Sequence, residues 1–144
     1  MAIEISEAMQ EAINGALMSG QCITISAVTP GGEPNVSFRG SVQSDGSDEL
    51  VLWTRNPEGS LAKSIALQPK VVLTYGDFST RNFFMCSGRA WIESSEPRRS
   101  AVYDGMVAGE QERDPERGGT AIVVQLDSVA GVGADGYPTD ALAN

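Results

Sequence analysis

The chain has 144 residues and a mass of 15.2 kDa, which fits a single domain. Its 19 acidic and 10 basic residues give a net charge of −9, so we expect neither a nucleic acid nor an anionic membrane surface as a partner. No apolar run approaches the roughly 20 residues of a membrane helix, and the first residues show no basic leader before an apolar stretch. The sequence therefore predicts a cytoplasmic globular protein.

The sequence contains no histidine, which excludes Ser-His-Asp and Cys-His catalysis and histidine-ligated zinc. The two cysteines, Cys22 and Cys86, each lie in an apolar, strand-like run. We expect both thiols to be buried packing groups, because two isolated cysteines form neither a disulfide framework nor a metal site. Chemistry must then come from carboxylates, lysine, arginine, tyrosine, cysteine or a bound cofactor.

The first third of the chain predicts one helix followed by strands. Apolar residues recur at three- and four-residue spacing over residues 5–17, with Ser6 as the cap and Gly20 as the end of the helix. An alternating, β-branched strand follows over 22–28 and ends in a turn. A second strand over 36–43 alternates polar and apolar side chains.

The middle of the chain predicts a hairpin partner, a helix and a further strand. Residues 50–54 follow the turn sequence Asp45-Gly46-Ser47-Asp48 and complete a hairpin with the strand before it. Residues 58–67 have helical spacing, and Pro69 stops that helix before a strand over 71–75.

The last third predicts a long strand over 81–92, with Gly88 as a bulge, and then a weaker helix over 96–107. The charged stretch 110–119 indicates a solvated loop whose charges pair with one another, and 120–126 form the last strand. Six short antiparallel strands with two to three peripheral helices predict a mainly β (α+β) barrel or closed sheet. We expect one domain over 1–132 and a Gly-rich flexible tail over 133–144.

The segment that begins at Trp53 has the layout of an anion site. A strand end delivers Thr54, Arg55, Ser60 and Lys63 to the mouth and first turn of a helix, where backbone N–H groups, a hydroxyl and a cation suit a phosphate. Arg39, on the neighbouring strand, is expected to join them from the same face of the sheet. The alternative is an ordinary capped helix with exposed basic residues.

The order of several short segments resembles the pyridoxamine 5′-phosphate oxidase-like family of flavin-binding split β-barrels. These segments are PNVSFRGS at 34–41, LWTR at 52–55, GSLAKSI at 59–65, QPKVVLTY at 68–75 and SGRA at 87–90. The resemblance extends over residues 5–132. It rests on the order and spacing of the segments rather than on any single motif.

The resemblance implies a six-stranded antiparallel split barrel that forms a homodimer, with flavin mononucleotide (FMN) in a cleft between two barrels. It implies an oxidoreductase that acts on an unidentified small organic substrate, with the flavin carrying the hydride. The cofactor contacts that it implies are Arg39, Trp53, Thr54, Arg55, Ser60, Lys63 and, from the partner chain, Asn82.

Two departures from the family pattern leave alternatives open. The phosphate lysine of the family usually lies one or two positions nearer the strand, where this chain has Leu61 and Ala62. The chain also has no Trp- and Arg-containing segment for pyridoxal phosphate near its end, so vitamin B6 oxidation is not expected. A deazaflavin-dependent reductase is one alternative. A non-catalytic homodimer that has lost the cofactor and serves as a ligand-binding protein is the other.

Overall fold

The computed structural model describes residues 3–132. The predicted tail over 133–144 lies outside this range. The elements in chain order are α1 (Glu7–Asn14), β1 (Ile23–Val28), β2 (Pro34–Arg39), β3 (Gln43–Asp45), β4 (Glu49–Thr54), α2 (Ser60–Leu67), β5 (Lys70–Asp77), β6 (Asn82–Glu93), α3 (Glu96–Gly105), α4 (Ala108–Gln111) and β7 (Thr120–Val132). No helix among these residues is both long and apolar enough to cross a bilayer.

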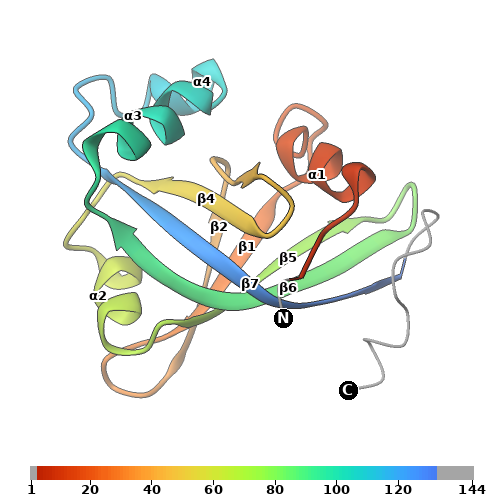
Figure 1. The fold of residues 1–144 in the computed structure, drawn as a ribbon, viewed down its shortest axis with the longest axis horizontal. Helices are drawn as coiled ribbons and strands as arrows, with labels where there is room; N and C mark the ends of the chain where they lie inside the picture. The colour runs from red at the N-terminus through yellow and green to blue at the C-terminus, as the bar shows by residue number, and fades with distance from the viewer. Residues whose placement is uncertain (1–2, 133–144) are drawn as a thin grey trace.

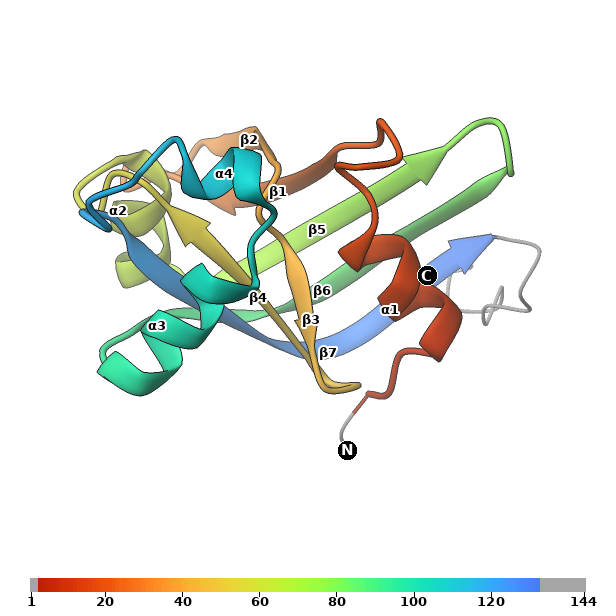
Figure 2. The ribbon, with the colours of Figure 1, turned by 90° about the horizontal axis from the view of Figure 1, so that it is seen from above.

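The seven strands form one antiparallel sheet in the order β2-β1-β5-β6-β7-β4-β3. The sheet is strongly coiled, and the long strands β6 and β7 cross its centre (Figure 1). The helices lie around this sheet: α2 contacts β1 and β6, α3 contacts β4 and β7, and α1 contacts β3. Figure 2 shows α1, α3 and α4 on the side of the molecule where β3 and β4 lie. The predicted mainly β fold with peripheral helices is confirmed.

Coiling brings the two edges of the sheet together at Ser41, which directly follows β2 and the Gly40 bend. The Ser41 hydroxyl donates a hydrogen bond to the Trp53 carbonyl oxygen at 3.1 Å and accepts one from the Trp53 amide at 3.0 Å. At the other end of β2, the Asn35 amide donates to the Ser60 hydroxyl at 3.1 Å. β2 is therefore joined to β4 at one end and to α2 at the other, and no ladder of backbone hydrogen bonds links β2 to β4.

The predicted count of six strands is low by one. The strand expected over 36–43 is interrupted at Gly40 and becomes β2 and β3, because Ser41 turns toward β4 to make the two bonds just described. Residues 3–132 also contain four helices, where two to three were expected, since part of the stretch expected to be a loop forms α4.

Several local signals in the sequence act as predicted. Ser6 caps α1 by accepting a hydrogen bond from the Met9 amide at 3.1 Å, as predicted. The helix, however, ends at Asn14 with Gly15 as its C-cap, so the predicted end at Gly20 is wrong; Gly20, with φ +81°, ends the turns that follow the helix. The register of β6 against β7 shifts at Gly88, where the extra residue is Asp127 of β7. An irregularity of the sheet at Gly88 is therefore present as predicted, but the bulged strand is β7 and not the strand that contains Gly88.

The core lies inside the coiled sheet. Leu52, Ile122 and Val124 are completely buried there, and α1 closes one end of it with Met9 and Ile13. A second apolar cluster lies between β4, β7 and α3, and it contains Val51, Trp53, Val102, Tyr103, Met106, Ala121 and Val123.

The two cysteines differ in burial. Cys86 is buried in the core, and burial raises the pKa of its thiol to about 12. Cys22 is exposed, so the prediction that both thiols point into the barrel is wrong for this residue. The reason is that β1 begins one residue later, with Ile23 taking the inward position.

Candidate functional site

A cavity of about 100 Å³ lies where the end of β2 approaches the end of β4. Three arginines line it: Arg39 from β2, Arg55 from the loop after β4, and Arg113 from the loop after α4. One carboxylate, that of Glu110 in α4, lies beside them. The remaining lining residues are Phe38, Gly40, Ser41 and Trp53.

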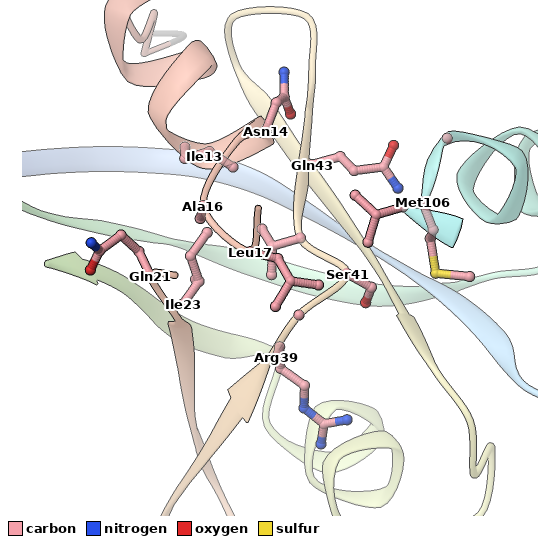
Figure 3. A pocket seen from close by; sticks show the side chains of 14 residues that line it. Ile13, Asn14, Ala16, Leu17, Gln21, Ile23, Arg39, Ser41, Gln43 and Met106 are labelled. Carbon is pink, nitrogen blue, oxygen red and sulfur yellow. The ribbon is translucent and has the colours of Figure 1, made fainter. Parts of the chain in front are cut away.

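Arg39 is positioned by the register of the sheet. It lies opposite Ile23, whose side chain is in the core, so Arg39 is on the inward face of β2 together with Asn35 and Ser37. Its Nε donates a hydrogen bond to the Ser37 hydroxyl at 3.0 Å. Figure 3 shows the Arg39 side chain pointing away from Leu17 and Ile23.

The electrostatics of Arg39 are those of a cation without a counter-ion in contact. Burial lowers the pKa of its guanidinium and the charge of Arg55 lowers it further, while the charge of Glu110 acts in the opposite direction. The net effect is a lowered pKa, although the group stays charged at any physiological pH. An anion bound beside Arg39 and Arg55 would relieve this repulsion.

The arginines of this cavity differ from most of the others in the chain. Arg89, Arg98, Arg99 and Arg117 form ion pairs with Asp127, with Asp45 and Glu49, with Glu96, and with Asp104, respectively. Within residues 3–132, no carboxylate oxygen lies within ion-pair distance of Arg39, Arg55 or Arg113. Three unpaired guanidinium groups around one cavity, in a chain of net charge −9, make it a candidate anion site.

The loop that carries Arg113 is held by Asp114. The Asp114 carboxylate accepts hydrogen bonds from Trp53 Nε1 at 2.9 Å, from the Gly118 amide at 2.9 Å and from the Gly119 amide at 2.8 Å. Burial acts to raise the pKa of Asp114, but these three bonds and the charge of Arg99 outweigh it and lower that pKa. The loop is therefore tied to β4 through a buried tryptophan.

Trp53 lines the cavity and is almost completely buried, whereas Thr54 is not among the residues that line it. Only 4% of Trp53 is exposed, and its ring packs edge to face on Tyr103 with centroids 5.2 Å apart and lies under the Arg99 guanidinium at 4.9 Å. Thr54 is buried directly after it. The structure encloses the Trp53 ring between β4, α3 and the Asp114 loop.

The start of α2 differs from the predicted hydroxyl-capped helix. Gly59 is the N-cap residue and no side chain caps the helix, so the expected hydroxyl cap is absent from α2. Ser60 is the first helical residue instead and accepts the hydrogen bond from Asn35. Lys63 is exposed, one turn into α2. Ser60 thus lies at the Asn35 end of β2, four residues along the strand from Arg39, and no hydrogen bond or ion pair joins Lys63 to β2 within the described residues.

Asn82 is remote from the arginines within one chain. It begins β6 opposite Asp77, and strands β1 and β5 separate it from β2. Its side-chain oxygen is buried and accepts no hydrogen bond within residues 3–132. The predicted contact of Asn82 from a partner chain stays a prediction, as do the cofactor contacts of the other six residues.

Glu110 and Arg113 were not predicted as site residues. The charged stretch 110–119 is expected from its sequence to be a loop whose charges pair with one another, whereas only Arg117 of that stretch forms an ion pair, and its partner is Asp104 of α3. The interleaved acids and bases carry no local signal for the direction of each side chain. Only the tertiary approach of α4 to Gly40 brings Glu110 to Arg39.

A second, smaller cavity of about 20 Å³ lies on the other side of the β2–β3 bend, between α1, Gln43 and Met106 (Figure 3). That volume holds about one water molecule. It is therefore not a ligand site.

Comparison with solved structures identifies the fold. HupZ of Group A Streptococcus superposes with a TM-score of 0.72 at 16% identity, over 90% of this chain and 95% of that one. A pyridoxamine 5′-phosphate oxidase-related, FMN-binding protein of Nostoc punctiforme superposes with a TM-score of 0.71 at 17% identity, over 91% of this chain and 83% of that one. The chain has the fold of the pyridoxamine 5′-phosphate oxidase-related proteins.

A third solved structure agrees with this fold. A Clostridium acetobutylicum protein related to general stress protein 26 of B. subtilis, of the pyridoxinephosphate oxidase family, superposes with a TM-score of 0.66 at 17% identity, over 90% of this chain and 92% of that one. No family model matches the sequence. No curated protein matches it either. The resemblance inferred from the order of short sequence segments is confirmed at the level of the fold.

Proposed function

We propose that this protein binds FMN with its phosphate group in the Arg39-Arg55-Arg113 cavity and acts as an oxidoreductase on a small organic substrate. The observation that carries the proposal is the set of three unpaired guanidinium groups around one cavity in an acidic chain. The shared fold with a protein described as FMN-binding supports the same cofactor. A deazaflavin is the alternative cofactor.

The residues present fit one part of this cofactor. Small-molecule sites generally have volumes of about 300–1,000 Å³, whereas this cavity has about 100 Å³. It therefore suits a phosphate group, and the tricyclic ring must lie outside it. Asn35, Ser37 and Arg39 form a polar row along the inward face of β2 that leads from the cavity to Ser60.

A second copy of the chain would enclose the ring. On the outward face of the sheet, two rows of side chains cross five strands, and every member is uncharged. The register gives these rows as Phe38, Thr24, Thr74, Met85 and Ala130, and as Val36, Ser26, Val72, Ser87 and Ser128. An open groove of about 470 Å³ runs along this face, and Lys70 and Asp127 also line it. The two uncharged rows form a neutral face in a chain of net charge −9 and allow two copies to approach with little charge repulsion, so we propose a homodimer across them.

In this arrangement the flavin supplies the two-electron chemistry. The residues of this chain bind and orient it. The guanidinium groups of Arg39, Arg55 and Arg113 hold the phosphate through charge-assisted hydrogen bonds, and the Asp114 loop holds Arg113 against β4. Phe38, which is 75% exposed at the cavity edge, provides an apolar surface on which the ring can lie.

Titration with FMN and with riboflavin tests the proposal. Arg55→Ala removes one charge-assisted hydrogen bond and should weaken FMN binding by about 1.5–3 kcal/mol, roughly ten- to a hundredfold. Riboflavin, which lacks the phosphate, should be affected much less. Arg98→Ala is the matched control, because it removes an arginine of α3 that already pairs with Asp45 and Glu49. Lys63→Ala in the same series tests whether α2 contributes to the phosphate contact.

Equal weakening of both ligands by Arg55→Ala would contradict a phosphate site in this cavity. Absence of flavin and deazaflavin binding by the unchanged protein would favour the non-catalytic ligand-binding alternative. The dimer is tested by light scattering at micromolar concentration. Met85→Glu should dissociate it, since Met85 lies in the neutral face, while Leu67→Glu on α2 should not. A monomeric unchanged protein would refute the shared site.

A further inference from the structure

The anion cavity contains one acidic group of the protein itself, the Glu110 carboxylate. Glu110 lies in α4, and its Oε1 atom is so close to Gly40 that a Cβ atom at residue 40 would overlap it. The carboxylate therefore rests against the backbone at the end of β2, next to Arg39. The absence of a side chain at Gly40 provides the space for this approach.

Glu110 interacts with Arg39 through space rather than by direct contact. Its charge acts to raise the pKa of Arg39, in opposition to burial and to Arg55. Within residues 3–132, however, its carboxylate forms no ion pair and no side-chain hydrogen bond. The Glu110 carboxylate lies beside three arginines but is bonded to none of them. It therefore partly neutralises the positive charge of the cavity without filling it.

We propose that Glu110 acts as an internal counter-charge of the cavity, and that an anionic ligand group binds in competition with it. This inference rests on the proposed phosphate site. The carboxylate compensates the three guanidinium groups when no ligand is bound. When a phosphate or carboxylate group binds, the two negative charges repel, and the flexible side chain of Glu110 moves away from Arg39. Glu110 thereby lowers the affinity of the cavity for anions. Only ligands whose remaining part contacts the protein outside the cavity then bind tightly.

The alternative role for Glu110 is that of a ligand contact, in which its carboxylate accepts a hydrogen bond from a hydroxyl or N–H group of the ligand. The two roles predict opposite effects of Glu110→Gln. Loss of an internal competitor strengthens anion binding, whereas loss of a charged acceptor weakens it.

The experiment compares Glu110→Gln with Glu112→Gln in the full chain. Glu112 is exposed, lies two residues away and undergoes the same change of charge, so it controls for the net charge of the protein. Binding of FMN and riboflavin is followed by flavin fluorescence, and binding of inorganic phosphate by NMR chemical shifts. Removal of one negative charge beside the site should tighten FMN and phosphate binding by about tenfold. Riboflavin binding, and all binding by Glu112→Gln, should change by less than about twofold.

Unchanged or weaker FMN and phosphate binding by Glu110→Gln, relative to Glu112→Gln, would overturn the inference. If FMN binding by the unchanged protein still depends on Arg55, that result leaves the proposed function standing and removes only the role of Glu110. If none of the proteins binds FMN or phosphate, both the site and the inference fail. Thermal unfolding of each variant, which should remain within about 2 °C of the unchanged protein, shows that the fold is retained.

Discussion

The Asp114 carboxylate is the most informative single group to perturb, because it joins the site loop to the second apolar cluster. Asp114→Asn keeps the size of the side chain but replaces one acceptor oxygen by an NH₂ group. At least one of the bonds from Trp53, Gly118 and Gly119 is then lost, and an N–H group faces a second donor. The remaining bonds lose the strength that the charge gave them.

The magnitude follows from these bonds. A hydrogen bond to a charged group contributes about 1.5–3 kcal/mol. Asp114 is half-buried, so solvent reduces this figure, and we expect a loss of about 2 kcal/mol of unfolding free energy at pH 7. For a domain of this size, that loss corresponds to a decrease of about 4–8 °C in Tm. Urea unfolding monitored by tryptophan fluorescence is a direct assay, because Trp53 donates one of the bonds.

The pH dependence gives a second, independent check. The folded-state pKa of Asp114 is lowered, so its contribution to stability is present above the unfolded-state value of about 3.9 and is lost as the pH falls through the folded-state value. The difference between the two proteins should therefore be constant from pH 7 to pH 5 and shrink toward pH 3. Asp104→Asn, which removes only the exposed partner of Arg117, should cost less than about 1 kcal/mol. A loss at Asp114 no larger than this, or one that persists undiminished at pH 3, would refute the reasoning.

Three further predictions concern packing, thiols and the cavity. Gly88→Ala should lower the unfolding free energy by at least ~2 kcal/mol in chemical unfolding, because its Cβ would overlap the carbonyl of Gln125. The control Gly109→Ala, with nothing near its Cβ, should be neutral or stabilising. Equal effects of the two substitutions would contradict the role of the bulge. A polar thiol reagent should label one thiol, Cys22, rapidly in native buffer and the second only on unfolding; fast labelling of both would contradict the burial of Cys86. Gly40→Ala should displace the Glu110 carboxylate at little cost in stability, because the obstructing atoms end a flexible side chain; a loss above about 2 kcal/mol in urea unfolding would show that the bend itself is rigid.

The parts of the fold that were predicted from sequence are those with local causes. The Ser6 cap, the turn at Gly32 with φ +84° and the bulge at Gly88 each depend on one residue and its immediate neighbours. The interruption between β2 and β3 has a different cause. Alternation continues through residues 36–43, and only the bonds from Ser41 to Trp53, twelve positions along the chain, turn the backbone there.

The candidate site was predictable in part for the same reason. Arg39 and Arg55 flank the predicted hairpin, so the sequence suggests their approach, although the bonds between Ser41 and Trp53, and not a ladder between β2 and β4, bring them together. Arg113 and Glu110 reach the same cavity from a charged stretch in which no spacing distinguishes inward from outward side chains. Their position depends on the hydrogen bonds of Asp114 and on the contact of α4 with Gly40.

The position of β7 in the sheet has a consequence for folding during synthesis. β7 pairs with β6 on one side and with β4 on the other, so the pairing of Glu49 with Gln125 joins residues 76 positions apart. Until residues 120–132 have left the ribosome, β4 has only the short β3 as a partner. The backbone hydrogen-bonding groups along the other edge of β4 then stay unpaired. Closure of the barrel must therefore follow synthesis of its last strand. Such long-range pairing makes folding slow compared with a helical protein of equal size, and it makes the incomplete chain a natural substrate for chaperones.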